Sequence, residues 1–387
     1  MTGDALDAAL LTPPVRRALG APEAVPTGWR VEPVGYRVIN QVTAGLYRVT
    51  GNAATANGPR PWALFLKLLR HDAADGHFAS SDEPAHWNYW RREALVYESD
   101  LLARLPSGLA APRCYGVSAP SADALWLWLE PVDGVPPSSW PLERYGQAAR
   151  HLGLFQGSSA ACPPPDMPWL SRRWLRAWVP AGANAAPELL ADPVAWQGIG
   201  LPGSVAATAM ALWQQRDRLI AAVEQLPQTL CHLDFWPPNL LARRLPDGRD
   251  QTVLLDWAQV GQGALGEDIA NLVLDSVWMF WVDPAVLAPF ERQIWQGYRD
   301  GLSDAGWAGD LRLVRLAFAL TAGLRFGLLG GGLLRLAADP ARHPELEQRY
   351  ARPIGQIIGA RAAAVAGGLT LGEEGLSLLG ELALFLP

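Results

Sequence analysis

The chain has 387 residues, half of them hydrophobic and 18% charged, so it can bury a large core, and its length suggests two or three domains or lobes. The formal net charge of −6 is mild, which argues against a basic surface for nucleic acid or an anionic membrane. The three cysteines lack disulfide or metal spacing and the N-terminus lacks the basic start of a signal peptide, so we expect a cytoplasmic location.

Residues 29 to 69 contain three short β-rich runs separated by Gly, Asn and Pro, which predicts an antiparallel sheet. The third run, WALFLKLL, contains Lys67, the only lysine of a chain with 32 Lys plus Arg. As a strand, this run places Ala63, Phe65, Lys67 and Leu69 on one face. A coding bias toward arginine, or chance, could also leave one lysine, so composition alone assigns it no function.

An amphipathic helix is predicted after the sheet, because an apolar stripe recurs there at helical spacing: Trp90, Ala94, Tyr97, Leu101 and Leu105. Glu93 projects from this stripe, and Glu98 is the alternative inward-facing acid. The run ALWLWLEPV predicts a further buried strand that ends at Pro131, and the Gly/Pro/Ser stretch VDGVPPSSW that follows is the expected lobe boundary.

The rest of the chain is predicted to be mainly helical, with helices at about 204–225, 267–281, 285–303, 310–336 and 341–365. In the stretch 310–336, Arg315, Arg325 and Arg335 leave uncharged gaps of nine residues, and crossing a bilayer takes about 20. We therefore expect buried helix there. The predicted organisation is an N-terminal extension (1–24), a sheet-bearing lobe (25–132), a helical lobe (133–370) and a C-terminal tail (371–387).

The segment LCHLDFWPPNLLARRLPDGRDQTVLLDW interrupts the helices and carries four polar residues of interest: His232, Asp234, Asn239 and Asp256. A two-residue turn at Asp247-Gly248 would make Asn239 and Asp256 cross-strand partners, with Cβ atoms about 5 Å apart. Their oxygens suit Mg²⁺, and Asp234 would lie nearby as a base. Taken singly, each has another interpretation: His232 as a core histidine, Asp234 as a turn cap, and Asp256 as the start of a loop.

The motif H-x-D-x-x-x-x-N, followed by Asp256-Trp257 after a hairpin, resembles the catalytic segment of the aminoglycoside phosphotransferase and choline kinase-like family, small-molecule relatives of protein kinases. The later run GEDIANLV, with Asp268, is similar to the helix start that follows the metal-binding loop in that family. The resemblance covers about residues 25 to 300 in element order. It implies an α+β, two-lobed protein-kinase-like fold, with a small antiparallel N-lobe sheet, one key helix and a larger helical C-lobe.

The resemblance also implies the cofactors ATP and Mg²⁺ and a set of roles. Asp234 would be the catalytic base, with His232 bracing its loop, and Asn239 and Asp256 would hold Mg²⁺. Lys67 would contact the α and β phosphates and pair with Glu93.

Backbone groups of the connection after the last sheet strand would receive adenine, from Trp128, Leu129, Glu130 and Val132. The phosphate-covering loop INQVTAGLYRV has only Gly45 and lacks the pattern G-x-G-x-x-G.

The function predicted from these features is ATP-dependent phosphorylation of a hydroxyl on a small molecule, such as a sugar-like metabolite or an antibiotic. From residue 135 to the end there are 24 acidic and 20 basic residues, which speaks weakly against a polycationic aminoglycoside. Residues that could line the acceptor pocket, or simply pack in a core, are Asp275, Trp278, Trp281, Asp283 and Arg325.

Two other functions stay open from the sequence. A catalytically silent kinase-like module could bind nucleotide and signal through a partner. A metal-dependent hydrolase could use His232, Asp234 and Asp256, but it would leave Lys67 unexplained. We expect a small-molecule acceptor as the partner and neither nucleic acid nor membrane, and the sequence leaves the oligomeric state undetermined.

Overall fold

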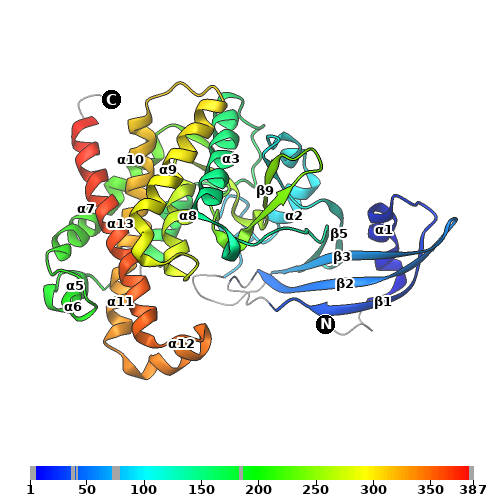
Figure 1. The fold of residues 1–387 in the computed structure, drawn as a ribbon, viewed down its shortest axis with the longest axis horizontal. Helices are drawn as coiled ribbons and strands as arrows, with labels where there is room; N and C mark the ends of the chain where they lie inside the picture. Colours follow the sequence, from blue (N-terminus) through cyan, green and yellow to red (C-terminus); the bar gives the residue numbers. More distant parts are fainter. Residues whose placement is uncertain (1–5, 36–39, 41, 72–78, 183–185, 383–387) are drawn as a thin grey trace. The chain divides into compact units, whose positions relative to one another are not determined.

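The structure is a computed structural model that describes residues 6–35, 40, 42–71, 79–182 and 186–382 (Figure 1). The chain divides into two compact units. Unit 1 comprises Met1–Gly134, Pro168–Leu170 and Arg243–Gln259. Unit 2 comprises Val135–Met167, Ser171–Ala242 and Val260–Pro387.

Unit 1 is built on a five-stranded sheet in the order β1-β2-β3-β6-β5, in which each strand runs antiparallel to its neighbours. This confirms the predicted antiparallel sheet and the α+β class. The strands are β1 (Val25–Pro33), β2 (Thr43–Thr55), β3 (Gly58–Arg70), β5 (Cys114–Ser121) and β6 (Ala124–Leu129).

The two faces of this sheet pack against different helices because side chains alternate along β3. Leu64 and Leu66 join the cluster that contains helix α1 (Ala8–Leu19). Leu69 and Phe65 join the cluster on the opposite face, which contains residues of α2 (Arg92–Glu98). The predicted alternation is therefore confirmed, and Lys67 lies on the α2 face.

Helix α1 is part of the core of unit 1, although residues 1–24 were expected to be an extension of the lobe. Leu11 and Val15 have no exposed surface and pack with residues of β2 and β3. The Asp7 side chain accepts a hydrogen bond from the Leu10 amide at 2.8 Å and caps the first turn. Gly20, with φ of 60°, ends the helix in the left-handed conformation that glycine adopts at little cost.

Helix α2 is shorter than the stripe from Trp90 to Leu105 predicted. It ends at Ser99, whose hydroxyl donates to the Val96 carbonyl at 2.9 Å, and a short 3₁₀ turn, Leu101–Arg104, follows. A serine that bonds the backbone competes with helical hydrogen bonding. Trp90, Ala94 and Tyr97 still face the sheet.

A second sheet contains β4 (Leu109–Ala110), β9 (Asp250–Leu254) and β8 (Leu240–Arg244) in the order β4-β9-β8. The loop between β8 and β9 corrects a prediction. The Leu245 amide donates to the Arg249 carbonyl at 2.8 Å, so the turn holds three residues, not two. A three-residue loop shifts the register by one, and Asn239 and Asp256 are therefore not the cross-strand pair that the sequence suggested.

Unit 2 is mainly helical, with one small sheet formed by β7 (Gln228–Cys231) and β10 (Gly261–Ala264). Its helices are α3 (Leu142–Ala161), α4 (Trp174–Gly182), α5 (Pro187–Leu190), α6 (Pro193–Gly198), α7 (Val205–Gln225), α8 (Glu267–Trp278), α9 (Leu287–Asp304), α10 (Leu311–Ala322), α11 (Gly330–Ala337), α12 (His343–Tyr350) and α13 (Ile354–Leu382). Short 3₁₀ turns span Pro137–Ser139, Pro237–Asn239, Pro284–Val286 and Pro340–Arg342.

Helices α3 and α9 approach each other closely because glycines lie between them. A Cβ atom added at Gly301 would lie 2.0 Å from the Arg150 carbonyl oxygen, and one at Gly153 would lie 2.2 Å from the Tyr298 carbonyl oxygen. No side chain fits at these contacts, so glycine sets how near the two helix axes can come.

Two helices that were predicted as continuous are interrupted. The stretch 310–336 is divided into α10 and α11 by a π-turn, η7 (Gly323–Gly327). The stretch 341–365 is divided at Ala351 to Pro353, because proline cannot continue the helix before it. Helix α13 then runs to Leu382, so the first part of the expected tail is helical.

Two helical stretches in the described residues, Leu311–Ala337 and Ile354–Leu382, are long and apolar enough to cross a membrane by length and composition alone. The most apolar window of the first is 83% buried within the structure and that of the second is 50% buried. Core helices of a soluble protein have the same property, so these stretches are weak support for a membrane location.

The packing of α1 generates a first prediction. Truncating the fully buried Leu11 to alanine should lower the free energy of unfolding by about 2–4 kcal/mol, because it removes buried methyl groups and leaves a cavity. Val25→Thr, at a strand position 49% exposed, is the control and should change stability by less than about 0.5 kcal/mol. Urea unfolding of both variants is the measurement, and equal stabilities would mean that α1 does not support the sheet.

Candidate functional site

Lys67 is buried on the α2 face of the sheet between two carboxylates. Its Nζ lies 2.6 Å from Glu93 Oε2 and 2.9 Å from Asp256 Oδ1. The residue is only 5% exposed. Unit 1 thus joins three of the predicted site residues from three distant parts of the chain.

Electrostatics keep this lysine charged. Burial lowers the pKa of Lys67, but the charges of Asp256 and Glu93 outweigh burial and hold that pKa above its ordinary value. Burial raises the pKa of Glu93, and the neighbouring Lys67 charge opposes that rise only in part. Because two carboxylates face one ammonium, Lys67 stays protonated.

Arg92, the residue before Glu93, is a part of this site that the sequence did not single out. It has no exposed surface, and its guanidinium donates to the carbonyls of Trp87, Trp169 and Ala258 at 2.8, 2.7 and 3.0 Å. It also donates to the carbonyls of Pro84 and His86. Arg92 therefore ties α2 to the segment just after Asp256 and positions Glu93. The only feature of the sequence that could have indicated this role is the position of Arg92 directly before the inward-facing Glu93.

In unit 2, a side chain in the first turn of α8 forms hydrogen bonds with the backbone of the segment after β7. Leu233 adopts a positive φ of 63°, a strained conformation for a leucine. The Asp268 carboxylate accepts hydrogen bonds from the amides of His232 and Leu233 at 2.8 and 2.6 Å. Gln156 of α3 donates to the same carboxylate at 2.8 Å. These bonds fix the backbone immediately before Asp234.

Asp234 and Asn239 are joined directly. Asn239 Nδ2 donates to Asp234 Oδ2 at 2.8 Å and to the Asp234 carbonyl at 3.0 Å. The amide nitrogen is thus used within the loop, which leaves the amide oxygen Oδ1 as the atom that could bind a cation. His232 is fully buried beside them.

Two of the five residues considered for an acceptor pocket are in contact. Arg325, in the π-turn, lies with Nη2 3.4 Å from Asp275 Oδ2, and it also donates to Asn271. Its guanidinium lies 4.6 and 5.1 Å from the ring centroids of Trp174 and Trp178. Asn271 and the two tryptophans were not predicted. A fixed cation, an acid and a stacked aromatic pair therefore meet in unit 2.

The other three residues behave differently. Asp283 is exposed and caps a 3₁₀ turn, because it accepts from the Ala285 amide at 2.8 Å. Trp281 is half-buried, and Trp278 contacts Arg361, whose guanidinium carbon lies 4.9 Å from the indole centroid. Asp283 therefore caps a turn, a role that the sequence analysis did not predict.

The residues proposed for adenine are on or after β6. The Trp128 side chain is fully buried in the α1 cluster, on the face opposite Lys67, so only its backbone could serve a ligand on the Lys67 face. Leu129 belongs to the α2 face, and the Glu130 amide already donates to the Arg113 carbonyl at 2.8 Å. Val132 is half-buried after the strand.

Gly45 lies in β2, opposite Leu68, next to a register shift. A Cβ there would lie 2.7 Å from the Tyr47 ring, so the close approach of that ring is a reason for glycine. Ile39 and Gln41 of the expected phosphate-covering loop lie outside the described residues.

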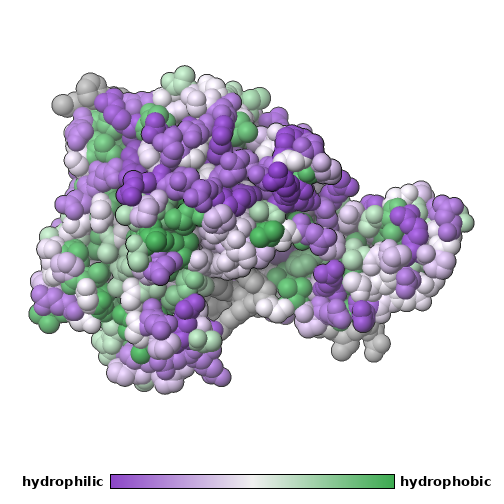
Figure 2. All heavy atoms as spheres, viewed as in Figure 1, coloured by the Kyte–Doolittle hydropathy of each residue, from purple (hydrophilic) through white to green (hydrophobic). Residues whose placement is uncertain are grey.

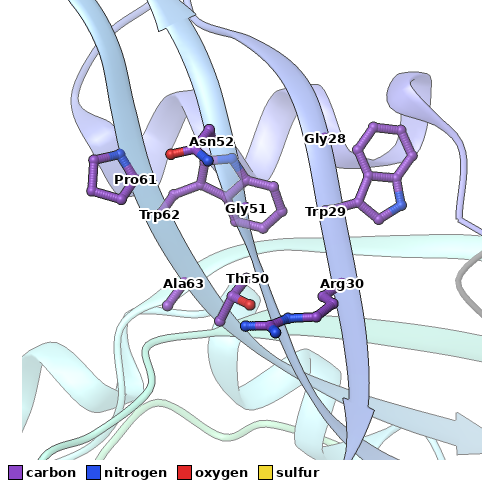
Figure 3. A pocket seen from close by; sticks show the side chains of 9 residues that line it. All are labelled: Gly28, Trp29, Arg30, Thr50, Gly51, Asn52, Pro61, Trp62 and Ala63. Atoms are coloured by element: carbon purple, nitrogen blue, oxygen red, sulfur yellow. The ribbon is translucent and has the colours of Figure 1, made fainter.

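A separate pocket of about 650 Å³ lies over β1, β2 and β3 (Figure 3). Its labelled residues come from all three strands and include Trp29, Arg30 and Ala63. Ala63 precedes Lys67 by four strand residues, which is roughly 13 Å. No predicted site residue lines this pocket.

The described residues contain no cluster of three or more His, Cys, Asp or Glu side chains placed to hold a metal ion. The predicted Mg²⁺ donors are one carboxylate and one amide, which is the kind of sparse oxygen set that Mg²⁺ accepts when phosphate and water complete its shell. Asp256 has a side chain 37% exposed, so it can reach a ligand while it pairs with Lys67. The donor chemistry therefore fits Mg²⁺.

A family model described as the phosphotransferase enzyme family matches residues 55–303, which is more than half of the chain. The chain therefore belongs to that family and is a phosphotransferase. The matched range includes Lys67, Glu93, Asp234 and Asp256. A comparison with curated proteins found no similar sequence.

Solved structures with a similar fold include an amicoumacin kinase, with 13% identity, coverage of 89% of this chain and 88% of that chain, and a TM-score of 0.49. An aminoglycoside phosphotransferase, APH(3'')-Id from Streptomyces rimosus, has 19% identity, coverage of 82% and 97%, and a TM-score of 0.40. An ethanolamine kinase from Plasmodium vivax has 10% identity, coverage of 90% and 83%, and a TM-score of 0.46. At these values the likeness says nothing about the acceptor.

The buried Asp268 generates a prediction about pH. Burial raises its pKa to about 6 from an ordinary 3.8, although the amides of His232 and Leu233 oppose the rise. The folded protein therefore retains this proton where the unfolded chain has lost it. The stability that this group contributes is complete below about pH 4 and is lost as pH rises through about 6.

Asp268→Asn removes this titration. The advantage of wild type over the variant in free energy of unfolding should shrink by about 2–3 kcal/mol between pH 4 and pH 7. Urea unfolding of both proteins at several pH values measures the difference. A difference that is constant with pH would contradict the raised pKa.

Proposed function

We propose that this phosphotransferase transfers the γ-phosphoryl group of ATP to a hydroxyl of a small molecule in the presence of Mg²⁺. The observation that carries the proposal is the single lysine of the chain, buried between Glu93 and Asp256 at 2.6 and 2.9 Å. A compact ammonium fixed by two carboxylates is suited to polyphosphate, and arginine cannot replace its geometry.

Unit 1 contains the residues that would bind the nucleotide. Lys67 would bind the α and β phosphates, and Glu93, positioned by Arg92, holds the ammonium in place. Backbone groups near Leu129, Glu130 and Val132 would receive adenine.

Asp256 and Asn239 would hold Mg²⁺ with their side-chain oxygens. When bound, the ion neutralises charge on the phosphate oxygens and orients them.

Unit 2 contains the residues that would serve the acceptor. Asp234 would accept the proton of the attacking hydroxyl and orient that hydroxyl toward the γ-phosphorus. Asn239 fixes the Asp234 carboxylate, and Asp268 fixes the backbone before it. We call residues 232–239, which carry Asp234, the base loop. Phosphoryl transfer depends mainly on positioning and charge, so the rigidity of this loop is the protein's main contribution here.

A sugar-like metabolite or a hydroxylated antibiotic is the proposed class of acceptor. A cytoplasmic location without a membrane or nucleic-acid partner also belongs to the proposal. It rests on the mild net charge and on three cysteines without disulfide spacing.

Turnover is tested by incubating the protein with Mg-ATP and a panel of diverse alcohols and by scoring a mass gain of one phosphoryl group. Wild type should phosphorylate one or more, and Asp234→Asn should lose at least about 100-fold in kcat because it removes the base. Asp217→Asn, an exposed acid on α7, is the charge-matched control and should retain activity. Normal turnover by Asp234→Asn would exclude Asp234 as the base.

Thermal unfolding with and without Mg-ATP, read together with the turnover assay, distinguishes a kinase from a catalytically silent module and from a hydrolase. A kinase and a silent module would both be stabilised by Mg-ATP, and Asp256→Ala would weaken that effect. Only the kinase would also show turnover. A wild type without Mg-dependent stabilisation by nucleotide would defeat the proposal, and hydrolysis by His232, Asp234 and Asp256 would then be the function to examine.

Lys67→Arg keeps the charge but changes its shape. We expect a loss of at least tenfold in kcat/KM with the fold retained, because guanidinium cannot sit between both carboxylates and reach the phosphates in the same way. Circular dichroism checks the fold, and the overpacked site should cost about 1–3 kcal/mol of stability. Arg70→Lys, exposed at the end of the same strand, is the matched control. Unchanged activity in Lys67→Arg would show that any cation suffices at this position.

A further inference from the structure

One face of α8 links the base loop to a second group of residues. Asp268, Asn271, Asp275 and Trp278 are spaced by three, four and three residues, which puts them on one face of the helix. Asp268 holds the backbone before Asp234, whereas Trp278 lies ten residues farther along, which is about 15 Å. The first two are almost fully buried, but the Asp275 side chain is 17% exposed and Trp278 is half-buried. The far end of this face therefore opens toward solvent.

At that end, Arg361 of α13 is enclosed by aromatic rings. The residue is 7% exposed, and its guanidinium carbon lies 4.9 Å from the Trp278 ring centroid and 5.0 Å from that of Tyr350. Arg352 lies 5.0 Å from the Phe280 ring, which meets Tyr350 edge-on at 5.5 Å. We call these five residues, Trp278, Phe280, Tyr350, Arg352 and Arg361, the Arg361 cluster.

Hydrophobic side chains gather at the α8–α9 connection on the face shown in Figure 2, and hydrophilic ones cover α12. The Arg361 cluster draws Phe280 from the α8–α9 connection and Tyr350 from the last position of α12. An apolar and a hydrophilic surface therefore meet there.

Arg325, which is buried in unit 2, and Arg315, which is half-buried there, both have acidic partners. Arg325 contacts Asp275 and Asn271, and Arg315 bonds Glu291 and Glu374. Among the residues that the structure describes, no carboxylate pairs with Arg361, and its buried Nε has no hydrogen-bond partner. Its polar neighbour is the Tyr350 side chain.

A buried cation without a counter-charge is costly, and the nearby Arg349, itself paired with Glu345 at 2.6 Å, does not offset it. Binding of an anion would remove that cost. Guanidinium is also the side chain best suited to bind a planar or tetrahedral oxyanion through two parallel N–H donors.

We propose that the Arg361 cluster binds an oxyanion group carried by the phosphoryl acceptor, with the aromatic rings packing against the adjoining apolar part of that molecule. This rests on the proposed function. The acceptor then has a hydroxyl at Asp234 and a carboxylate, sulfate or phosphate at the far end of α8, whose rise from Asp268 to Trp278 is about 15 Å.

The first test uses inorganic sulfate and needs no acceptor. Thermal unfolding of wild type, Arg361→Gln and Arg335→Gln is compared in sodium sulfate and in sodium chloride at equal ionic strength. Sulfate stabilises proteins in general, so the measured quantity is the difference between the variants. Arg335→Gln removes the same charge at a half-exposed position of α11 and controls for net charge.

Arg361→Gln should lose part of the sulfate-specific stabilisation that wild type and Arg335→Gln share. Equal sulfate effects in all three proteins would overturn the proposal. If Arg361→Gln fails to fold, Arg361→Lys takes its place, because it keeps the charge but loses the guanidinium fork, and a reduced sulfate effect is again expected.

The second test compares each acceptor found in the alcohol screen with its neutralised form, such as a methyl ester of a carboxylate or a dephosphorylated or desulfated analogue. Wild type should prefer the anionic form by about tenfold or more in kcat/KM, mainly through KM, since a charged hydrogen bond contributes about 1.5 kcal/mol or more. Arg361→Gln should lose this preference while its stabilisation by Mg-ATP is unchanged.

Each outcome has a distinct meaning. Equal turnover of anionic and neutralised forms by wild type, or discrimination that survives in Arg361→Gln, would overturn the subsite. Absence of both turnover and Mg-ATP stabilisation in wild type would instead overturn the proposed function, and the sulfate comparison would still decide whether Arg361 binds an oxyanion. Which of the three oxyanions is used follows from the acceptors that show the preference.

Discussion

The burial of one positive charge organises unit 1. Lys67 is almost inaccessible to water, and a lone ammonium in that position would be unstable, so Glu93 and Asp256 must both reach it. This requirement fixes α2 against the sheet and fixes the segment after β9 against α2. Arg92 strengthens the arrangement, since its guanidinium joins α2 to the Ala258 carbonyl. The fold of unit 1 therefore delivers three charged side chains to one point.

Unit 2 is organised in a similar way around a buried carboxylate. The Asp268 carboxylate is buried at the start of α8 and is satisfied by the amides of His232 and Leu233 and by Gln156. These bonds hold Leu233 in its strained conformation, which sets the direction in which Asp234 leaves the backbone. Farther along α8, Asn271 and Asp275 contact Arg325, and Trp278 contacts Arg361 of the Arg361 cluster. One helix thus connects the base loop with the region proposed to recognise the acceptor.

Much of this could be predicted because the signals are local. The alternation along WALFLKLL placed Lys67 on the face opposite Leu64 and Leu66, and the structure confirms it. The motif with His232, Asp234 and Asn239 pointed to the phosphotransferase family, which the family model confirms. The register of the β8–β9 hairpin was wrong by one residue, because Asp247-Gly248 fits both a two-residue turn and the three-residue turn that forms. Turn length depends on hydrogen bonds that the dipeptide alone does not specify.

The sequence by itself determined the elements, the chemical types and the family: a single lysine in a strand, an inward glutamate on the next helix, and the spaced acids of the base segment. Only the tertiary structure decided the partners of the buried charges. Asp256 as well as Glu93 reaches Lys67, Arg325 contacts Asp275, and Arg361 contacts aromatic rings while no acid among the described residues pairs with it. All of these contacts join distant segments of the chain. Periodicity shows which residues turn inward. Which inward residues meet depends on how the helices and strands pack, and that is where charge pairing is settled.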